Sequence, residues 1–150
     1  MAFTNEDKNS AAAAASSFLK GKISDEQLNA SLDVIKSGSG DSVSAQGDYI
    51  CAVFYWRVVL NSGNYQFKGN AGGVGGIGGG STNGTIYLAS GVSFQQLVSN
   101  TDSFQFNAVV GVYLNVNFFD SGSNFLGSYQ GGGVGTCGGT GGGSGSWSQV

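Results

Sequence analysis

The chemistry open to this chain is limited first by a missing residue type. Its 150 residues contain no histidine, which excludes Ser-His-Asp and Cys-His catalytic arrangements and removes the commonest metal ligand of proteins. From residue 47 onward the carboxylates are Asp48, Asp102 and Asp120, any two of which could form a glycosidase-like acid pair. Each is predicted to stand beside a turn or strand end, where aspartate ordinarily caps the backbone. We therefore predict no catalytic residues, no metal and no cofactor, and a protein that is not an enzyme.

The two cysteines, Cys51 and Cys137, are the remaining reactive groups. Their separation does not match the spacing of metal ligands. They could form a disulfide if the first and last parts of a barrel are neighbours, and two buried free thiols are the equal alternative. The same region carries two cations, Arg57 and Lys68, which are too few for a strong anion site.

Two sets of glycines match the dinucleotide-binding motif G-x-G-x-x-G, and they are Gly73, Gly75 and Gly78, and Gly133, Gly135 and Gly138. Neither set is followed by a predicted helix, whose N-terminus would be needed to bind a pyrophosphate. In a chain with 28 glycines such matches arise by chance. The formal net charge of −3 and the scattered positions of the six Lys and Arg residues also argue against a nucleic-acid partner.

Composition divides the chain near Gly47. Six of the nine acidic residues precede it, whereas 25 of the 28 glycines lie at or after it. Residues 1–46 are predicted to form helices near 10–20 and 25–36 and then a Ser/Gly linker over 38–46, because alanines fill the first segment and Ser24 with Gln27 makes a capping box. The start of the chain shows no classical export signal, since acidic residues occupy the region that a signal peptide makes positive.

Residues 47–150 are predicted to form one glycine-rich β domain. Tyr49 to Leu60 is a β-branched and aromatic run, and turn residues 61–64 lead into a return arm over 65–69. Ser93 is expected to cap a short helical turn. Residues 103–119 alternate apolar and polar side chains, which predicts one buried and one solvated face. Seven or eight short strands favour a closed barrel or a sandwich.

The glycine tracts 72–80 and 131–145 could be flexible linkers, but we predict strands, because both lie between segments that must pair for a barrel to close. Glycines would leave space for large side chains to fill a small barrel and exclude a ligand, and the side chains expected inside are Phe54, Trp56, Phe104 and Phe106.

Two sets of side chains are candidates for outward-facing contacts. The polar set is Gln105, Asn115 and Asn117, which would offer hydrogen bonds to a protein or a glycan. The aromatic set is Tyr55, Tyr113 and Trp147, for which cross-strand pairing is the alternative role. No binding residue is assigned on this basis.

Several segments resemble the virulence-associated protein (Vap) family of rhodococci. DSFQFNAVVGVYLNVNFFDSGSNFLGSYQGGGVG (102–135) and GGGSGSW (141–147) are similar to the carboxy-terminal core of that family, and GDYICAVFYWR (47–57) and FKGNAGG (67–73) are similar to its first two strands. The resemblance implies a mainly β fold: a compact, closed, eight-stranded antiparallel barrel with Greek-key connections, avidin-like in shape, without a ligand cavity or a catalytic site.

The same resemblance implies a secreted or cell-surface virulence protein. The leading expectation is a non-enzymatic, toxin-like effector that acts at endolysosomal or other host membranes, with a membrane lipid or a membrane-associated protein as partner. The alternative is a structural or interaction module that binds a protein or glycan through the polar barrel surface. The helix-prone segment before residue 47 departs from the family pattern, and function could have shifted with it.

Overall fold

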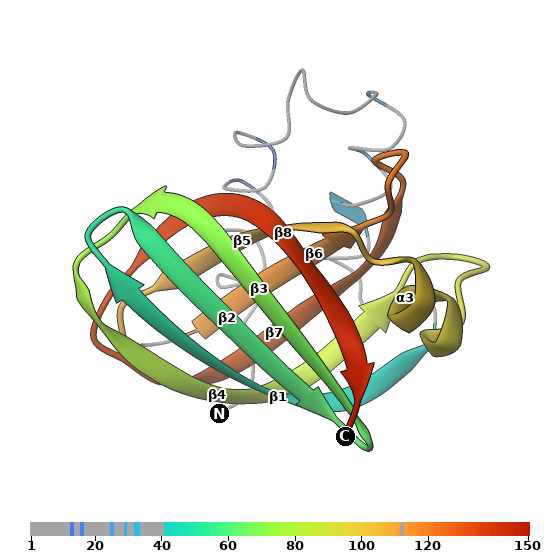
Figure 1. Ribbon diagram of the computed structural model, residues 1–150, viewed down its shortest axis with the longest axis horizontal. Coiled ribbons are helices and arrows are strands. Elements are labelled where there is room, and N and C mark those ends of the chain that lie inside the picture. Colours follow the sequence, from blue (N-terminus) through green and yellow to red (C-terminus); the bar gives the residue numbers. More distant parts are fainter. Residues whose placement is uncertain are drawn as a thin grey trace.

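The computed structural model describes residues 41–111 and 113–150, together with Ala13, Ser16, Asp25, Asn29, Leu32 and Asp33. The helices predicted near 10–20 and 25–36 therefore lie mostly outside the described residues. From Asp41 onward the described chain forms a closed barrel of eight antiparallel strands and one short helix (Figure 1). Its elements are β1 (Ser42–Ala52), β2 (Tyr55–Ser62), β3 (Tyr65–Val74), β4 (Ile77–Leu88), α3 (Phe94–Asn100), β5 (Ser103–Val109), β6 (Tyr113–Phe119), β7 (Phe125–Gly135) and β8 (Gly139–Gln149).

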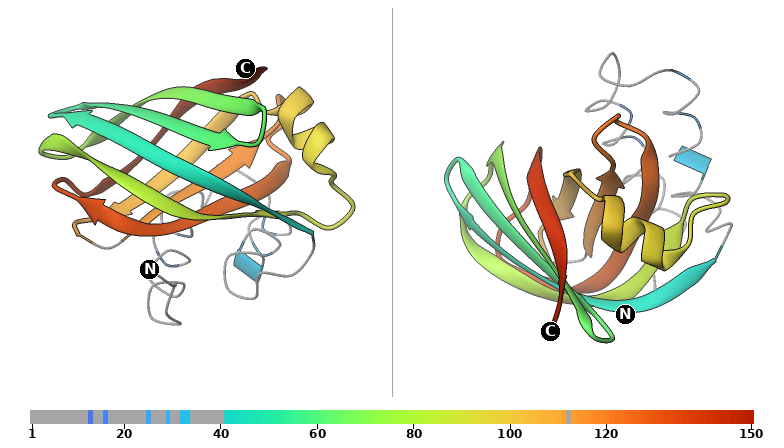
Figure 2. Two further views of the ribbon diagram at one scale, coloured as in Figure 1. Left: turned by 90° about the horizontal axis from the view of Figure 1, so that it is seen from below. Right: turned by 45° about the vertical axis from the view of Figure 1, so that its right-hand side comes forward.

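The barrel is built from two Greek keys of the same pattern. Around its circumference the strands follow the order β1-β2-β3-β8-β5-β6-β7-β4, so β4 returns beside β1 in the first half and β8 returns beside β5 in the second. The β3–β8 and β4–β7 pairings join the halves. Closure pairs both edges of every described strand, which removes the sites at which open sheets aggregate. The predicted fold class is thus confirmed, and Figure 2 shows the barrel from two further sides.

The first strand begins earlier than predicted. Ser42 to Gln46 belong to β1 and pair with β4, with Ser42 opposite Tyr87 and Gln46 opposite Asn83. The prediction of a linker up to residue 46 and a barrel from residue 47 is therefore wrong by five residues. The physical reason is alternation: Val43 and Ala45 continue the inward face, while the serines occupy outward positions.

The run from Tyr49 to Leu60, predicted as a single strand, is two strands. A tight turn at Val53 and Phe54 separates β1 from β2, and Val53 adopts a φ of 61°, which is uncommon for a β-branched residue. No glycine, asparagine or proline marks this turn. It is held instead by the neighbouring β3–β4 turn, through hydrogen bonds from Val53 N to Gly76 O (2.9 Å) and from Gly75 N to Val53 O (2.9 Å).

Aromatic side chains pack the interior of the barrel. Trp56, Phe67, Phe106, Phe118 and Tyr129 are fully buried, and the ring centroids of Trp56 and Phe106 lie 4.5 Å apart. Phe104 is also buried, whereas Phe54 in the β1–β2 turn is 70% exposed. The prediction that Phe54 fills the barrel is therefore wrong, because the unforeseen turn directs it outward.

The glycine tracts form strands, as predicted. β3 runs to Val74 and β4 starts at Ile77, and β7 runs to Gly135 and β8 starts at Gly139. Gly69 illustrates the reason inside the barrel, where a Cβ would overlap the ring of Phe104. Gly84 illustrates it between strands, since a Cβ there would overlap the carbonyl oxygen of Gln130 on β7. Glycine allows both close approaches.

Helix α3 covers the barrel end opposite the β1–β2 and β3–β4 turns (Figures 1 and 2). Ser93 caps it in a capping box: its Oγ accepts from Gln96 N at 3.1 Å, and its own N donates to Gln96 Oε1 at 2.8 Å. Leu97 is fully buried, and Phe94 packs edge-on against Trp147 at 5.8 Å. The predicted helical turn at Ser93 is confirmed.

Candidate functional site

Exposed apolar side chains gather at the barrel end that holds the turns between β1 and β2, β3 and β4, β5 and β6, and β7 and β8. Nine of the ten large hydrophobic residues that are exposed in the described chain lie there, and Val150 is the tenth. We call this surface the apolar end, and its residues are Ile50, Val53, Phe54, Tyr55, Val74, Ile77, Val109, Val110 and Val134. Single exposed hydrophobic residues are ordinary, but a group of this size on one end indicates contact with a partner.

Charged residues are absent from the described turns of the apolar end and lie mainly toward the other end of the barrel. The described segments that build the apolar end, 50–56, 72–79, 108–111 and 133–140, contain no Asp, Glu, Lys or Arg. Asp41, Asp102 and Asp120 lie toward the other end, beside β1, β5 and the β6–β7 turn. The turns of the apolar end therefore carry no charge, Arg57 is exposed beside them as the register partner of Ile50, and three aspartates lie toward the other end.

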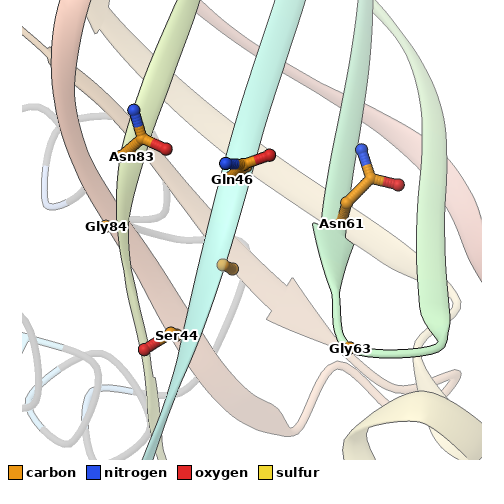
Figure 3. A pocket seen from close by; sticks show the side chains of 7 residues that line it. Ser44, Gln46, Asn61, Gly63, Asn83 and Gly84 are labelled. Carbon is orange, nitrogen blue, oxygen red and sulfur yellow. The ribbon is translucent and has the colours of Figure 1, made fainter.

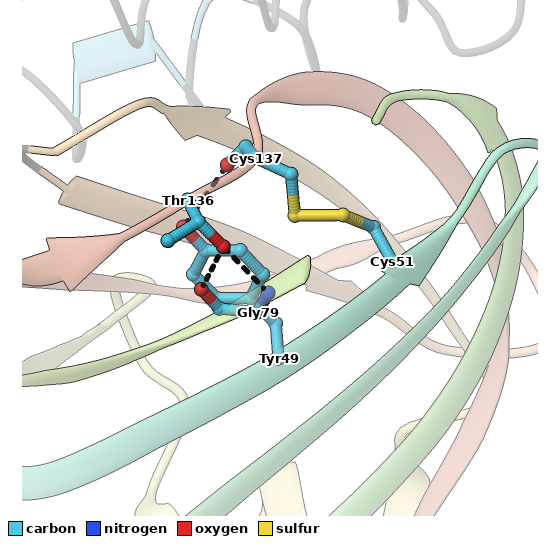
Figure 4. Close-up of a disulfide and its surroundings, with 5 residues drawn as sticks. All are labelled: Tyr49, Cys51, Gly79, Thr136 and Cys137. Carbon is cyan, nitrogen blue, oxygen red and sulfur yellow. Dashed lines mark hydrogen bonds between the residues drawn. A yellow bond between two sulfur atoms is a disulfide. The ribbon is translucent and has the colours of Figure 1, made fainter. Parts of the chain in front are cut away.

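A disulfide fixes the apolar end. Cys51, near the end of β1, is bonded to Cys137 in the β7–β8 turn, and both are buried (Figure 4). The hydroxyl of Tyr49 donates to the carbonyl oxygen of Cys137 at 3.1 Å, and Thr136 Oγ1 accepts from Gly79 N at 3.1 Å. Burial raises the pKa of Tyr49 above 10.0, so this hydrogen bond persists at ordinary pH. The turn is thus attached to both β1 and β4.

The polar side chains of β5, β6 and β7 form a hydrogen-bonded network, which we call the buried amide network: Gln105, Asn107, Asn115, Asn117 and Ser128. Asn107 Nδ2 donates to Asn115 Oδ1 at 2.8 Å. Asn115 Nδ2 is within 2.9 Å of Ser128 Oγ and 3.1 Å of the Tyr129 carbonyl oxygen. Asn117 Nδ2 donates to Gln105 Oε1. Each amide of the network therefore has another amide as a hydrogen-bond partner.

This network contradicts the predicted solvated face. Gln105, Asn115 and Asn117 are at most 1% exposed, so they cannot contact a protein or glycan in this conformation. The strand character of 103–109 and 113–119 is confirmed, but polar character does not require exposure when hydrogen bonds are satisfied internally. Residues on both faces of β6 are buried.

Among the predicted aromatic contacts, only Tyr55 is exposed, at 46%. Its hydroxyl donates to Asn70 Oδ1 on the adjacent strand β3, which is the cross-strand pairing that was the alternative. Tyr113 is buried, and Trp147 points inward against Phe67 and Phe118. The outward exposure expected for Tyr113 and Trp147 is therefore wrong.

The three carboxylates serve separate structural roles. Asp120 Oδ1 accepts from Gly122 N and Asn124 N at 2.9 Å each, as expected of a turn-capping aspartate. Asp102 is exposed at the start of β5. Asp48 lies in the middle of β1 and not at a strand end as predicted, and it accepts from Ser81 Oγ at 2.6 Å. Within the described residues, no group of three or more His, Cys, Asp or Glu side chains could hold a metal ion.

Thr82 and Tyr129 form hydrogen bonds between strands in the interior of the barrel. Thr82 Oγ1 donates to Gly47 O at 3.0 Å and lies 2.7 Å from the Tyr129 hydroxyl. Burial, opposed by the hydrogen bond with Thr82, raises the pKa of Tyr129 to about 12. The folded barrel therefore favours the neutral, protonated form of Tyr129.

These features define a class of protein: a small, disulfide-bonded, closed Greek-key barrel with an aromatic interior and one apolar end. In comparison with known proteins, residues 2–148 match the family described as Rhodococcus equi virulence-associated protein. Comparison with curated proteins gives no match.

Solved structures from Rhodococcus equi agree with the family match. The virulence-associated protein VapB is 38% identical, with a TM-score of 0.64, over 73% of this chain and 98% of the VapB chain. The virulence-associated protein VapD is 33% identical, with a TM-score of 0.65, over 72% of this chain and 97% of the VapD chain. The chain belongs to the virulence-associated protein family.

The apolar end was not predicted from the sequence, although a signal was present. Turns in β proteins are usually rich in polar residues, Gly and Pro, whereas the turn at 53–54 consists of Val and Phe, and the glycine turn at 75–76 is flanked by Val and Ile. Apolar turn residues without a nearby charge are the pattern that could have located it.

Proposed function

We propose that this protein is a non-enzymatic virulence effector that acts at endolysosomal or other membranes of a host cell, and that it reaches them by secretion or from the cell surface. Membership of the virulence-associated family supports a role in virulence. The observation that carries the membrane proposal is the apolar end, which combines exposed Phe54, Val74 and Ile77 with turns that contain no charged residue.

Lipid contact at this end is driven by apolar surface and not by charge. Removing one Val, Ile or Phe side chain from water is worth roughly 1.5–3 kcal/mol, and several such side chains can enter the interface together. The described barrel carries Asp41, Asp48, Asp102 and Asp120 against Arg57 and Lys68, so anionic lipid gives it no attraction. None of the described helices is long and apolar enough to cross a membrane.

The test is flotation of the full chain with neutral phosphatidylcholine vesicles, together with dye release, at neutral and acidic pH. We expect binding that hardly changes with salt, because charge screening has nothing to weaken. Phe54→Ser should weaken partitioning about tenfold, which corresponds to about 1.4 kcal/mol of lost apolar transfer.

The matched controls are two exposed valines. Val74 and Val150 are 69% and 72% exposed, but only Val74 belongs to the apolar end. Val74→Ser should weaken vesicle binding, and Val150→Ser should leave it unchanged. Equal effects of the two substitutions, or no binding and no leakage with any vesicle, would overturn the proposal and favour a module that binds a protein or glycan.

A further inference from the structure

A second surface of the barrel carries four amide side chains in one line. Asn83 on β4, Gln46 on β1, Asn61 on β2 and Gln66 on β3 are direct register partners, each opposite the next across adjacent strands. We call them the exposed amide row. Figure 3 shows Asn83, Gln46 and Asn61 side by side, each from a different strand and all directed away from the barrel.

The backbone holds this row rigidly. Every member lies within a paired strand, and neighbouring strands are about 4.8 Å apart. Small residues border the row, and a shallow, open hollow of about 500 Å³ lies over three of its four members. Its lining includes the amides of Gln46, Asn61 and Asn83 and the small residues Ser44, Gly63 and Gly84.

The amides of this row retain much of their hydrogen-bonding capacity. The side chains of Gln46 and Asn83 make no hydrogen bond to any described residue, and both residues are exposed. Asn61 Oδ1 accepts from Gln66 Nε2 at 2.9 Å, and this bond is the sole side-chain hydrogen bond of Asn61 within the described chain. Each free amide can both donate and accept.

The chemistry of the hollow narrows the class of ligand. No charged or large apolar side chain lines it, which disfavours phosphates, carboxylates and lipid chains. Because the barrel is closed, there is also no free strand edge in the described chain for a peptide to extend by β-augmentation. A neutral chain rich in hydroxyl groups is the ligand that matches paired donors and acceptors.

We propose that the exposed amide row is a binding site for a neutral oligosaccharide that lies across β4, β1, β2 and β3. Amide groups spaced by one strand separation place donors and acceptors at intervals close to the length of one pyranose ring, so successive sugar units meet successive strands. The rigid sheet keeps the cost of ordering these side chains low. This site is independent of the apolar end and of the membrane proposal.

The test is a heteronuclear NMR titration of the full chain with neutral glucan and mannan oligosaccharides, and with a sialylated oligosaccharide for comparison. We expect shift changes centred on Gln46, Asn61 and Asn83 with a neutral sugar. Gln46→Ala and Asn83→Ala should each weaken binding about fivefold, as the loss of one hydrogen bond predicts. Gln46→Glu, which keeps the size but replaces a donor by a charge, should weaken binding at least as much.

The control is Asn70→Ala, an exposed amide on the same outer face that lies four residues along β3 from Gln66 and accepts from the Tyr55 hydroxyl. It should leave sugar binding unchanged. Equal weakening by Asn70→Ala, shift changes centred elsewhere, or no shift changes with any neutral sugar at millimolar concentration would overturn the proposal. Preferential binding of the sialylated sugar would also contradict it, because the site has no cation.

Discussion

The barrel carries two sets of amide side chains of similar composition and opposite character. In the buried amide network on β5 and β6, Asn115 bonds to Asn107, Ser128 and the Tyr129 carbonyl oxygen and is fully buried. In the exposed amide row, the side chains of Gln46 and Asn83 make no hydrogen bond to a described residue and line a hollow. The first set is internally satisfied, and the second is open to a ligand.

The difference teaches that residue type alone does not distinguish a structural polar group from a recognition group. A buried amide must have its partners, because leaving it unsatisfied costs more than the bond itself contributes. An exposed amide exchanges its hydrogen bonds with water and can exchange them again with a ligand. Functional interpretation therefore has to follow from the geometry of each amide.

The largest expected effect on stability concerns the disulfide between Cys51 and Cys137, which joins strands that carry members of the two sets. The disulfide ties β1, which carries Gln46, to the turn after β7, which carries Ser128. The double substitution Cys51→Ser and Cys137→Ser should lower the free energy of unfolding by roughly 4 kcal/mol, because it frees an 86-residue loop in the unfolded chain. Chemical denaturation measures the change. A reducing agent should have the same effect on the native chain and none on the variant, and an unchanged midpoint would contradict the assignment.

Disrupting the buried amide network should lower the free energy of unfolding somewhat less than removing the disulfide does. Asn115→Ala removes a side chain that bonds to Asn107, Ser128 and Tyr129, and leaves their polar atoms buried. We expect a loss of about 3 kcal/mol, summed from unsatisfied groups of roughly 1–3 kcal/mol each. Gln46→Ala is the matched control on the exposed row and should change stability by less than about 0.5 kcal/mol. Similar losses for the two variants would remove the distinction between the sets.

Alkaline pH should lower the free energy of unfolding through Tyr129, which lies next to both amide sets. Its carbonyl oxygen accepts from Asn115 of the buried amide network, and its hydroxyl bonds to Thr82. Its pKa is about 12 in the folded barrel, against an ordinary tyrosine pKa of 10.0. The stabilising difference is therefore fully present below pH 10 and is lost as pH rises from 10 to 12, by roughly 2–3 kcal/mol in all. Denaturation midpoints between pH 8 and pH 12, at roughly unit intervals, measure this slope. Tyr129→Phe should flatten it, and an equal slope in that variant would assign the loss to other groups.

The smallest effect is expected from Gln66→Ala. This substitution removes the bond from Gln66 Nε2 to Asn61 Oδ1 at the edge of the exposed row. Because water replaces the bond, the free energy of unfolding should fall by no more than about 0.5 kcal/mol. A thermal or denaturant unfolding curve tests this. A loss comparable to that of Asn115→Ala would show that the exposed row is structural.

Much of the fold was predictable from the sequence. The strands within 103–119, the turn at 61–64 and the cap at Ser93 were each indicated by a local sequence pattern, and the structure contains all three. The glycine tracts were interpretable because a closed barrel requires strands at those positions. These signals depend on neighbours in sequence, which is why they could be read directly.

The errors have a common physical origin in contacts between distant segments. The turn at Val53 depends on Gly75 and Gly76, and the strand character of Ser42 to Gln46 depends on pairing with β4. The burial of Gln105 and Asn117 likewise depends on their mutual hydrogen bond between strands. The register that aligns Asn83, Gln46 and Asn61 also comes from pairing, so neither amide set could be located before the topology was known.

The position of β8 has a consequence for how the barrel is made. β8 is the last strand in sequence order, yet it lies between β3 and β5 and joins the two Greek keys. Until β8 has been synthesised, β3 and β5 each keep an unpaired edge, and the aromatic interior remains open to water. Folding is therefore expected to finish only after synthesis of the barrel sequence, and slowly, because its decisive pairings are far apart in the chain.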